Sequence, residues 1–393
     1  MGTRSCCVKV HLAAVLVPAL AATALAQPSF EGLGDLAGGM YNSEGWRVAD
    51  SGLAVAGGGT IDTGSMAFRW STIDGIVRLG TLPGFDDTSF ATGLSADGRA
   101  VCGHSAGAAG TEAFRWTADG GMVGLGDLPG GPHASVANFI SADGSTVVGT
   151  ADQDFTNNTM QAFRWAEATG MVGLGYTQNH HDWSEAWAAS ADGSVVTGLS
   201  LKIGSDGEAY VWTQPTGMVG LGDVPGGVDF SVGVDITPDG TVVTGTCAPE
   251  AGFEAFRWTQ ATGIVPLGDL PGAGHYSTGI GITDDGSVIV GTADWDGGFG
   301  GSQAFIWDAT NGMRSLKTVL ESEYGLDLNG WTLLSAYDIS GDGRYITGPG
   351  INPNGNHEAW LVDLGGCPGD FNNDGNVNTI DVLDFLNAWT NGC

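Results

Sequence analysis

Short apolar and β-branched runs, separated by Gly and Asp, recur along most of the chain. In one well-preserved unit the runs cover residues 135–141, 146–149, 162–165 and 171–175. Such runs between Gly and Asp turns are typical of short strands joined as hairpins. The Asp143-Gly144 turn joins the first two runs, and a loop of variable length joins the second to the third. Each unit is therefore predicted to form four strands.

The third strand of each unit carries a four-letter signature, Ala-Phe-Arg-Trp. Its clean and degenerate copies end at Trp70, Trp116, Trp165, Trp212, Trp258, Trp307 and Val362. Neighbouring tryptophans in this series are 46 to 49 residues apart. Self-similarity at a period of this length indicates a repeat architecture with one supersecondary unit per repeat.

A leucine marks the fourth strand of every unit. The leucines are Leu33, Leu79, Leu125, Leu174, Leu221, Leu267 and Leu316. The chain begins with a lone fourth strand at residues 31–36, and it ends with only three strands, near 335–339, 344–347 and 358–361. We therefore expect the N-terminal strand to complete the last unit and to leave no open edge.

These observations predict an all-β fold. Seven units of about 46 residues, with four strands each, fit a seven-bladed β-propeller that the N-terminal strand closes. An open β-solenoid is the alternative, but it does not explain the split final unit.

The periodic side chains are predicted to be structural. Phe68, Trp70 and their equivalents should fill the space between blades, although a tryptophan stripe can also be a sugar platform. Val211 and Ile306 replace the signature arginine in two units. We therefore expect a partly buried position, where arginine pairs with a carboxylate or a carbonyl. Asp97 and its equivalents precede a glycine and are interpreted as turn formers.

Composition narrows the class of protein. Glycine makes up 68 of the 393 residues and 42% of the residues are apolar, which fits tight turns around a large core better than disorder. The formal net charge is −31. Such a chain repels nucleic acid and anionic lipid, because phosphate-binding surfaces need basic clusters. The acidity suits a soluble exported protein or divalent cations.

Residues 1–26 are predicted to be a signal peptide. Arg4 and Lys9 precede an apolar stretch at residues 15–25, and a small-x-small cleavage site ends at Ala26. The mature protein is expected to be secreted, either extracellular or at the cell surface. No other stretch is apolar enough for a membrane span.

Four cysteines lie beyond the predicted signal peptide: Cys102, Cys247, Cys367 and Cys393. An oxidising compartment permits disulfides, and four cysteines allow three pairings. Cys367 and Cys393 bracket one short C-terminal module, so a disulfide between them is favoured. Cys102 and Cys247 lie in different repeats and are expected to be buried thiols.

The loops opposite the Asp-Gly turns are the predicted ligand-binding region, because variable loops on a rigid scaffold commonly carry function. Two long loops, at residues 150–161 and 292–303, are rich in aspartate, and the connection at 176–183 breaks the repeat pattern. The candidate ligand residues are Asp152, Asp154, His180, His181, Asp182, Trp183, Asp294 and Asp296.

Three loop histidines, His133, His181 and His275, occupy corresponding connections of different units. A metal or catalytic cluster is one interpretation, and solvated loop histidines are the other. No zinc pattern, nucleophile elbow, phosphate loop or dinucleotide fingerprint occurs in a convincing context. The sequence therefore predicts no catalytic residue.

Three submotifs recur in one order: Ala-Phe-Arg-Trp, Gly-Met-Val-Gly-Leu-Gly-Asp-Leu-Pro-Gly-Gly, and Asp-Gly-x-x-Val-x-Gly. In these the chain resembles the HAF family of extracellular repeats, over residues 30 to 364. The resemblance implies an exported repeat protein and adds no catalytic residues. The predicted domains are the signal peptide, a repeat propeller at 27–364 and a separate module at 365–393.

The C-terminal module contains a twelve-residue, EF-hand-like calcium loop at residues 370–381. Its predicted ligands are Asp370, Asn372, Asp374, Asn376, Asn378 and Asp381. Asn376 would offer its backbone carbonyl, Asn378 would act through water, and Gly375 would form the sharp turn. An acidic turn cluster without metal is the alternative, and the final Asp in place of Glu leaves the Ca²⁺ affinity open.

A helix is predicted after the loop, because Val382, Phe385, Leu386 and Trp389 share one face. Loop and helix together resemble one half of a type I dockerin. That resemblance places Thr379 and Ile380 at partner-recognition positions. The resemblance implies a cohesin-like partner. Dockerins normally carry two such segments and only one is visible here, which leaves a surface-anchoring tag as the other interpretation.

The sequence thus favours a secreted, non-enzymatic binding or scaffold protein. Its propeller would bind a protein or a glycan, and its Ca²⁺-stabilised module would attach it. The alternative is a carbohydrate-active hydrolase or lyase of a polysaccharide-degrading system, because dockerin-like modules accompany such enzymes. That alternative predicts a pair of carboxylates clustered on the loop face.

Overall fold

A computed structural model describes residues 27–85, 88–108, 110–129, 134–154, 159–178, 182–201, 207–250, 252–272, 274–294 and 301–365. The chain divides into two units, of which residues 27–365 form one. The signal peptide, the calcium loop, Thr379, Ile380 and the Cys367–Cys393 pair lie outside the described residues.

The described unit is all-β apart from one short helix. Four antiparallel sheets each contain four consecutive strands. Their strands are β2 (Ser43–Val48), β3 (Ala54–Ile61), β4 (Gly64–Ser71) and β5 (Gly75–Arg78); β6 (Thr88–Leu94), β7 (Ala100–Gly107), β8 (Gly110–Thr117) and β9 (Gly121–Gly124); β18 (Ser231–Ile236), β19 (Val242–Cys247), β20 (Glu254–Thr259) and β21 (Gly263–Pro266); and β22 (Ser277–Ile282), β23 (Val288–Asp294), β24 (Ser302–Asp308) and β25 (Gly312–Ser315).

Two further groups of four strands share one sheet, because a single parallel pair, Met160 with Trp183, links them. The groups are β10 (Ser135–Ile140), β11 (Thr146–Asp154), β12 (Thr159–Ala166) and β13 (Gly170–Gly173), then β14 (Trp183–Ala189), β15 (Val195–Leu201), β16 (Gly207–Thr213) and β17 (Gly217–Gly220).

The last sheet joins the two ends of the described chain. It contains β1 (Ser29–Gly32), β29 (His357–Asp363), β28 (Tyr345–Ile351), β26 (Thr332–Leu333) and β27 (Asp338–Ile339). β1 pairs antiparallel with β29, and the backbone N–H of Leu33 donates to the carbonyl of Ala359. Leu79, Leu125 and Leu174 make the same bond to the signature alanine of their own sheets. The N-terminal strand therefore takes the register that a fourth strand takes elsewhere.

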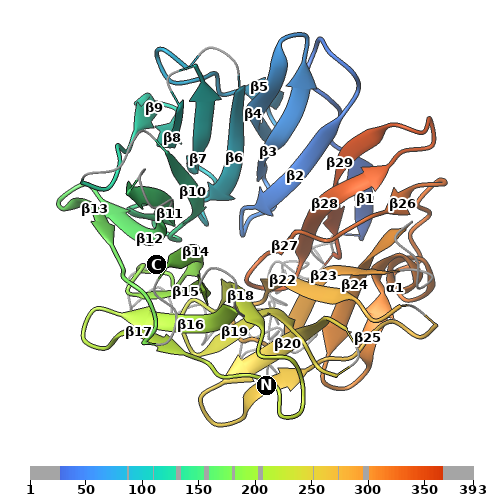
Figure 1. The fold of residues 1–393 in the computed structure, drawn as a ribbon. Coiled ribbons are helices and arrows are strands. Elements are labelled where there is room, and N and C mark those ends of the chain that lie inside the picture. The colour runs from blue at the N-terminus through green and yellow to red at the C-terminus, as the bar shows by residue number, and fades with distance from the viewer. Residues whose placement is uncertain are drawn as a thin grey trace, which may run out of the picture. The chain divides into compact units, whose positions relative to one another are not determined.

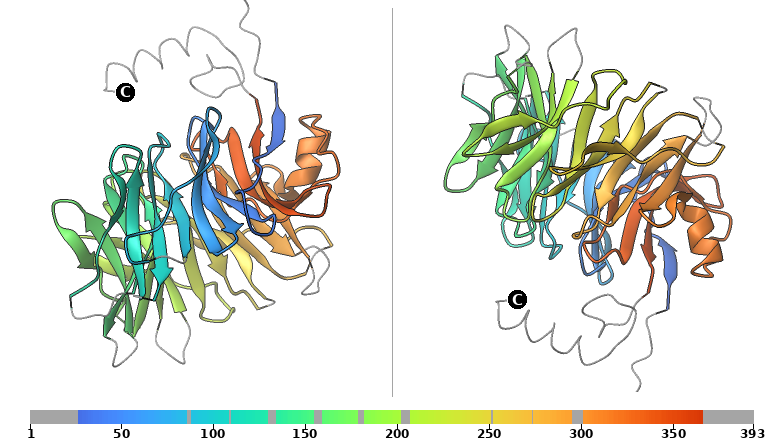
Figure 2. Two further views of the ribbon diagram at one scale, coloured as in Figure 1. Left: turned by 90° about the horizontal axis from the view of Figure 1, so that it is seen from above. Right: turned by 90° about the horizontal axis from the view of Figure 1, so that it is seen from below.

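The sheets of this unit are arranged radially, as Figure 1 shows. The first strands β2, β6, β10, β14, β18 and β22 lie nearest the centre together with β27, and β5, β9, β13, β17 and β25 lie toward the outside. Figure 2 shows that the strands run between two faces on which the connections gather. The Asp-Gly turns therefore lie on one face, and the longer loops lie on the other.

The signature residues pack and bond as the sequence predicts. Phe68, Phe114, Phe163, Phe256 and Phe305 are fully buried. Tryptophans of the signature pack against the preceding sheet, as where Trp116 joins a core cluster that contains Ala54 and Leu82. The burial of these large side chains between sheets contributes apolar stabilisation to the fold.

Each signature arginine binds the next repeat. Nε donates to the carbonyl of the downstream turn glycine, from Arg69 to Gly98 at 2.7 Å and from Arg257 to Gly286 at 2.9 Å. Arg115 and Arg164 make the equivalent bond. The predicted carbonyl partner is thus confirmed, and it links neighbouring sheets.

The aspartates of the Asp-Gly turns are confirmed as turn formers. Asp97 Oδ1 accepts from the hydroxyl of Ser95 and from the backbone N–H of Arg99. Gly98 has a φ of 71°, in the left-handed region that favours glycine. These hydrogen bonds lower the pKa of Asp97 against the opposing effect of burial, which is the largest single influence on it.

Three details differ from the sequence prediction. β1 ends at Gly32, not at residue 36, because Gly34 has a φ of 84° and turns the chain away. Leu316 does not lie in a strand but begins α1 (Leu316–Ser322), whose Leu316, Val319 and Leu320 are buried. The first strand of the last group is split into β26 and β27, which pair separately with β28.

Two of the cysteines are described, Cys102 and Cys247, and both are buried free thiols, as predicted. Burial raises the pKa of each thiol to about 12, so neither is a reactive thiolate at neutral pH. No helix within the described ranges is long and apolar enough to cross a membrane.

Candidate functional site

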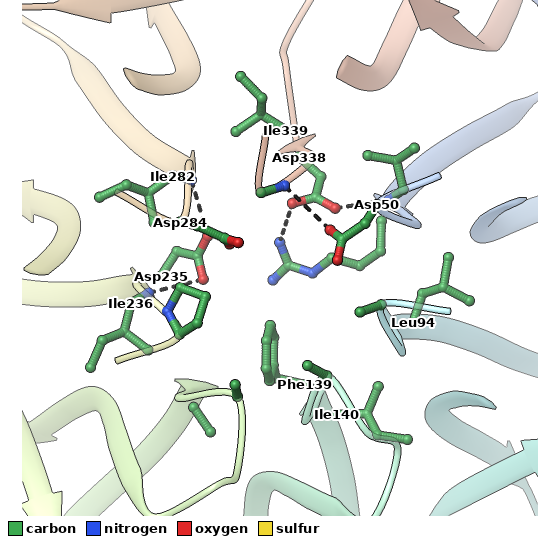
Figure 3. Close-up of a pocket in the computed structure, with 18 residues that line it drawn as sticks. Asp50, Leu94, Phe139, Ile140, Asp235, Ile236, Ile282, Asp284, Asp338 and Ile339 are labelled. Carbon is green, nitrogen blue, oxygen red and sulfur yellow. Dashed lines mark hydrogen bonds and ion pairs between the residues drawn. The ribbon is translucent and has the colours of Figure 1, made fainter. Parts of the chain in front are cut away.

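A pocket of about 230 Å³ lies at the centre of the radial arrangement (Figure 3). It is lined by β2, β6, β10, β14, β18, β22 and β27, or by the turn that follows each of them. It therefore opens toward the face of the Asp-Gly turns, not toward the face of the longer loops.

Five charged residues give the pocket its chemistry. Three of them, here called the inner residues, are Arg47, Asp235 and Asp338. Asp235 is 6% exposed to solvent, and the side chains of Arg47 and Asp338 are 12% and 13% exposed. The other two, here called the rim residues, are Asp50 and Asp284, and both are exposed.

A β-bulge in the first strand places Arg47 and Asp235, while Asp338 begins β27, the second piece of the split first strand of the last group. The pairing of β2 with β3 shifts register between Gly45 and Arg47, and that of β18 with β19 shifts between Gly233 and Asp235. A bulge re-aims the side chain that follows it. The same shift precedes Gly93, Phe139, Ala188 and Gly281 in the other first strands.

The rim residues occupy the position two residues before the turn glycine, Gly52 for Asp50 and Gly286 for Asp284. Backbone hydrogen bonds join one turn to the next at this position. The N–H of Asp50 donates to the carbonyl of Ala96 at 3.1 Å, that of Ala96 to Ala142 at 3.0 Å, and that of Asp284 to Gly341 at 2.9 Å. Gly341 N–H in turn donates to Asp50 Oδ1 at 3.3 Å. The rim is therefore held by the backbone, and its side chains can vary.

Asp338 lies between two hydrogen-bonding groups of β2. Its Oδ2 accepts from the backbone N–H of Val48 at 2.8 Å, and its Oδ1 lies 3.6 Å from Nη1 of Arg47. Burial nevertheless raises the pKa of Asp338 to about 7, because loss of water outweighs the nearby guanidinium. Arg47 also lies over the ring of Phe139, at 5.4 Å from its centroid.

Asp235 is held by two backbone donors. Its Oδ1 accepts from Ile236 at 2.9 Å and its Oδ2 accepts from Ile282 of the neighbouring sheet at 3.2 Å. Burial raises its pKa to about 6, although Arg47 and both hydrogen bonds favour the charged form. The rim carboxyls follow the same trend, since partial burial raises the pKa of Asp50 and of Asp284, and Asp50 raises that of Asp284 further.

The pocket therefore has an excess of carboxyl groups. Arg47 is its only cation among the lining residues, and it pairs with Asp338. Asp50, Asp235 and Asp284 have no ion pair within the described residues. Raised pKa values mean that the pocket disfavours negative charge on its own carboxyl groups, so a cationic group would be attracted and would restore their ionisation.

The loop residues predicted as ligands belong to three groups of strands. Asp152, in β11, is buried, and Asp294 ends β23. Asp182 precedes β14, and Trp183 donates from Nε1 to Glu185 at 2.8 Å. Asp154 ends β11, with its side chain outside the description, and His180, His181 and Asp296 lie outside the described residues. None of the described members lines the central pocket.

The histidine cluster is only partly described. His275 Nδ1 lies 3.5 Å from Asp269 Oδ2, while His133 and His181 fall outside the described ranges. Within those ranges no three His, Cys, Asp or Glu residues are grouped so as to hold a metal ion.

The sequence reasoning missed the inner and rim residues, although a signal was present. When the repeats are aligned on the turn glycine, the inner position carries Gly93, Ala188 and Gly281 in three units but Arg47, Asp235 and Asp338 in three others. The rim position carries Ala96, Ala142 and Ala191 but also Asp50 and Asp284. Departures from the repeat consensus at two fixed positions marked the pocket.

Comparison with solved structures agrees with the radial arrangement. Oligogalacturonate lyase from Vibrio parahaemolyticus matches with a TM-score of 0.54 at 11% identity, over 86% of this chain and 97% of that one. The β-propeller domain of the Trilobed protease from Pyrococcus furiosus matches with a TM-score of 0.51 at 10% identity, over 86% and 94%. The described unit has a β-propeller fold.

These likenesses show the fold of the propeller alone. A match to TolB from Acinetobacter baumannii has a TM-score of only 0.39 at 12% identity; it covers 58% of this chain and spans about half of that one, 53%. No protein-family model matches the chain, and no curated protein matches it.

Proposed function

We propose that this protein is a secreted, non-enzymatic binding protein built on a closed, seven-bladed propeller. Three observations support the closed ring: the pairing of β1 with β29, the hydrogen bond from Ala359 to Ser43, and a central pocket to which seven first strands contribute. A closed ring leaves no free sheet edge, so its rigid faces are suited to hold a partner.

The central pocket is proposed to bind a basic side chain, lysine or arginine, of a partner protein. The observation that carries this function is the arrangement of carboxyls in two layers, with Asp50 and Asp284 at the rim and Asp235 below them. An extended cationic side chain would pass the rim and reach Asp235, while Phe139 and the isoleucines of the wall contact its methylenes.

A capped peptide, Gly-Gly-Arg-Gly-Gly, tests this function, with the neutral citrulline peptide as its control. Titration calorimetry should give one site per protein for the arginine peptide and at least tenfold weaker binding for citrulline, because only arginine carries charge. Binding should be stronger at pH 8 than at pH 5.5, where Asp235 and Asp338 hold protons.

Asp284→Ala is the decisive variant, because three other repeats carry alanine at this position. It should weaken arginine-peptide binding severalfold and leave stability unchanged. Glu250→Ala, an exposed loop position on the other face, changes the net charge equally and should bind as the wild type. Equal binding of both peptides, or no effect of Asp284→Ala, would overturn the proposed pocket.

We also propose that the C-terminal module binds Ca²⁺ and attaches the protein to a cohesin-like or surface partner. In the full chain, Asp374→Ala should lose one Ca²⁺ relative to the wild type. Asn376→Ala should retain it, because that residue offers its backbone carbonyl. Equal Ca²⁺ stoichiometry in wild type and Asp374→Ala would rule out the calcium loop.

A further inference from the structure

A groove of about 100 Å³ lies along the first half of β2, at the opposite end of that strand from the central pocket. Glu44 and Trp46 of β2 line it, together with Gly58 of β3. Glu44 and Gly58 are direct cross-strand partners.

The groove exists because Gly58 has no side chain. In five other groups the equivalent pair has two, as in Phe90 with His104, Glu185 with Leu199 and Val136 with Thr150. A Cβ built on Gly58 would meet only Phe90 Cδ1, at 3.6 Å, which is an ordinary contact. Gly58 also lacks a positive φ. Neither the turn nor the packing therefore requires glycine at this position.

The same Glu-x-Trp sequence occurs in β14, where the carboxylate of the glutamate accepts hydrogen bonds from tryptophans of its own strand. Glu185 accepts there from Nε1 of Trp183 at 2.8 Å and from Nε1 of Trp187 at 3.1 Å. The side chain of Glu44 makes no hydrogen bond or ion pair within the described residues, and Asn42 stands where β14 has Trp183. The β2 copy thus leaves its carboxylate open to a ligand.

One further polar atom of the groove also lacks a partner. The Oδ1 atom of Asn42, which lines the groove, is buried without a hydrogen-bond partner in the described chain. Trp46 is 37% exposed, and its ring is supported by Tyr337, with centroids 5.3 Å apart. A held aromatic ring beside two acceptors without donors fits a ligand that has an apolar face and several hydroxyl donors.

We propose that this groove binds a neutral, hydroxyl-rich glycan. The C–H face of a sugar ring would lie on Trp46, while its hydroxyls donate to Glu44 and Asn42. A polyuronate would be repelled by Glu44 and by the net charge of −31. This site goes beyond the proposed function, because it uses other residues and another ligand than the central pocket.

Affinity electrophoresis of the full protein, in gels with neutral β-glucan, galactan, xylan or mannan, tests the proposal. At least one polysaccharide should retard the wild type, equally at 0.15 M and 1 M NaCl, because the contacts involve no ion pair with the ligand. Trp46→Ala should weaken binding at least tenfold. Gly58→Thr, which installs the residue that β11, β19 and β23 carry at this position, should fill the groove and abolish retardation.

Trp187→Ala is the matched control, because it removes the equivalent tryptophan from the copy in which Leu199, not glycine, stands opposite the glutamate. It should bind as the wild type, and circular dichroism should show that all three variants fold. The proposal is overturned if no neutral polysaccharide binds, if Gly58→Thr binds normally, or if Trp187→Ala loses as much as Trp46→Ala. Salt-sensitive binding of the arginine peptide that Trp46→Ala abolishes would assign the groove to a cation instead.

Discussion

The backbone N–H of Ala359 donates a 3.1 Å hydrogen bond to the hydroxyl oxygen of Ser43, although 316 positions separate them in the chain. The same bond joins Ala113 to Ser135 at 3.0 Å, where the two residues are only 22 positions apart. The hydroxyls of Ser43 and Ser135 in turn donate to the carbonyls of Gly34 and Gly126. The contact between the ends of the unit thus repeats one found inside it.

Replacement of this hydroxyl should lower stability. Ser43→Ala leaves the buried N–H of Ala359 and the carbonyl of Gly34 without partners, at a cost of about 1–3 kcal/mol. Ser135→Ala is the internal reference, and urea denaturation should give similar losses for the two variants. A much smaller loss for Ser43→Ala would show that the two ends do not meet as described.

The arginine bond between sheets should be measurable as well. Arg69→Val removes the donor to Gly98 and copies the residue that replaces arginine at position 211. We expect a loss of about 1–2 kcal/mol in the free energy of unfolding, because a charge-assisted bond to a carbonyl is removed. Arg99→Val, at a side chain that is 86% exposed, is the control and should cost less than about 0.5 kcal/mol.

Alanine substitution at two glycines distinguishes the cost of backbone strain from the cost of steric crowding. Gly75 and Gly98 have φ angles of 65° and 71°. A Cβ on Gly75 meets nothing within 4 Å, while one on Gly98 would lie 2.8 Å from the Cβ of Ala54. Gly75→Ala should therefore cost about 1 kcal/mol from strain alone, and Gly98→Ala should cost clearly more. Equal losses in thermal denaturation would contradict the close packing of the turn on the neighbouring sheet.

Stability should fall as pH rises from 4 to 7. Burial raises the pKa of Asp235 to about 6 and of Asp338 to about 7, so the folded protein holds protons that the unfolded chain has released. Their contribution is complete below the unfolded value near 3.8 and is lost as pH passes 6 and 7, about 3 kcal/mol for Asp235 and about 4 kcal/mol for Asp338.

Asp235→Asn should flatten that part of the pH profile. Asp239→Asn is the control, because the hydroxyls of Thr237 and Thr241 lower the pKa of Asp239, and its stabilisation is lost only as pH falls below about 4. Melting temperatures between pH 3 and 8 distinguish the two variants. An unchanged slope between pH 4 and 7 in Asp235→Asn would mean that this carboxyl is not protonated in the folded protein.

Local pattern was sufficient where the chain repeats itself. The periods of Phe68, Trp70 and Arg69 predicted strands, packing between sheets and a buried arginine partner, because each of these depends on neighbours one repeat away. Strand ends were harder to predict. The apolar run at residues 31–36 suits a strand throughout, but Gly34 adopts a left-handed conformation and ends it early.

The sequence by itself determined the all-β repeat, the turn chemistry and the register that places β1 beside β29, since these follow from periodicity in one dimension. Only the tertiary structure decided which deviations matter. Arg47, Asp235 and Asp338 are up to 291 positions apart in the chain, and they meet because the first strands of different repeats converge on one central pocket. Likewise Gly58 is one glycine among 68 until folding sets it opposite Glu44 and beside Trp46.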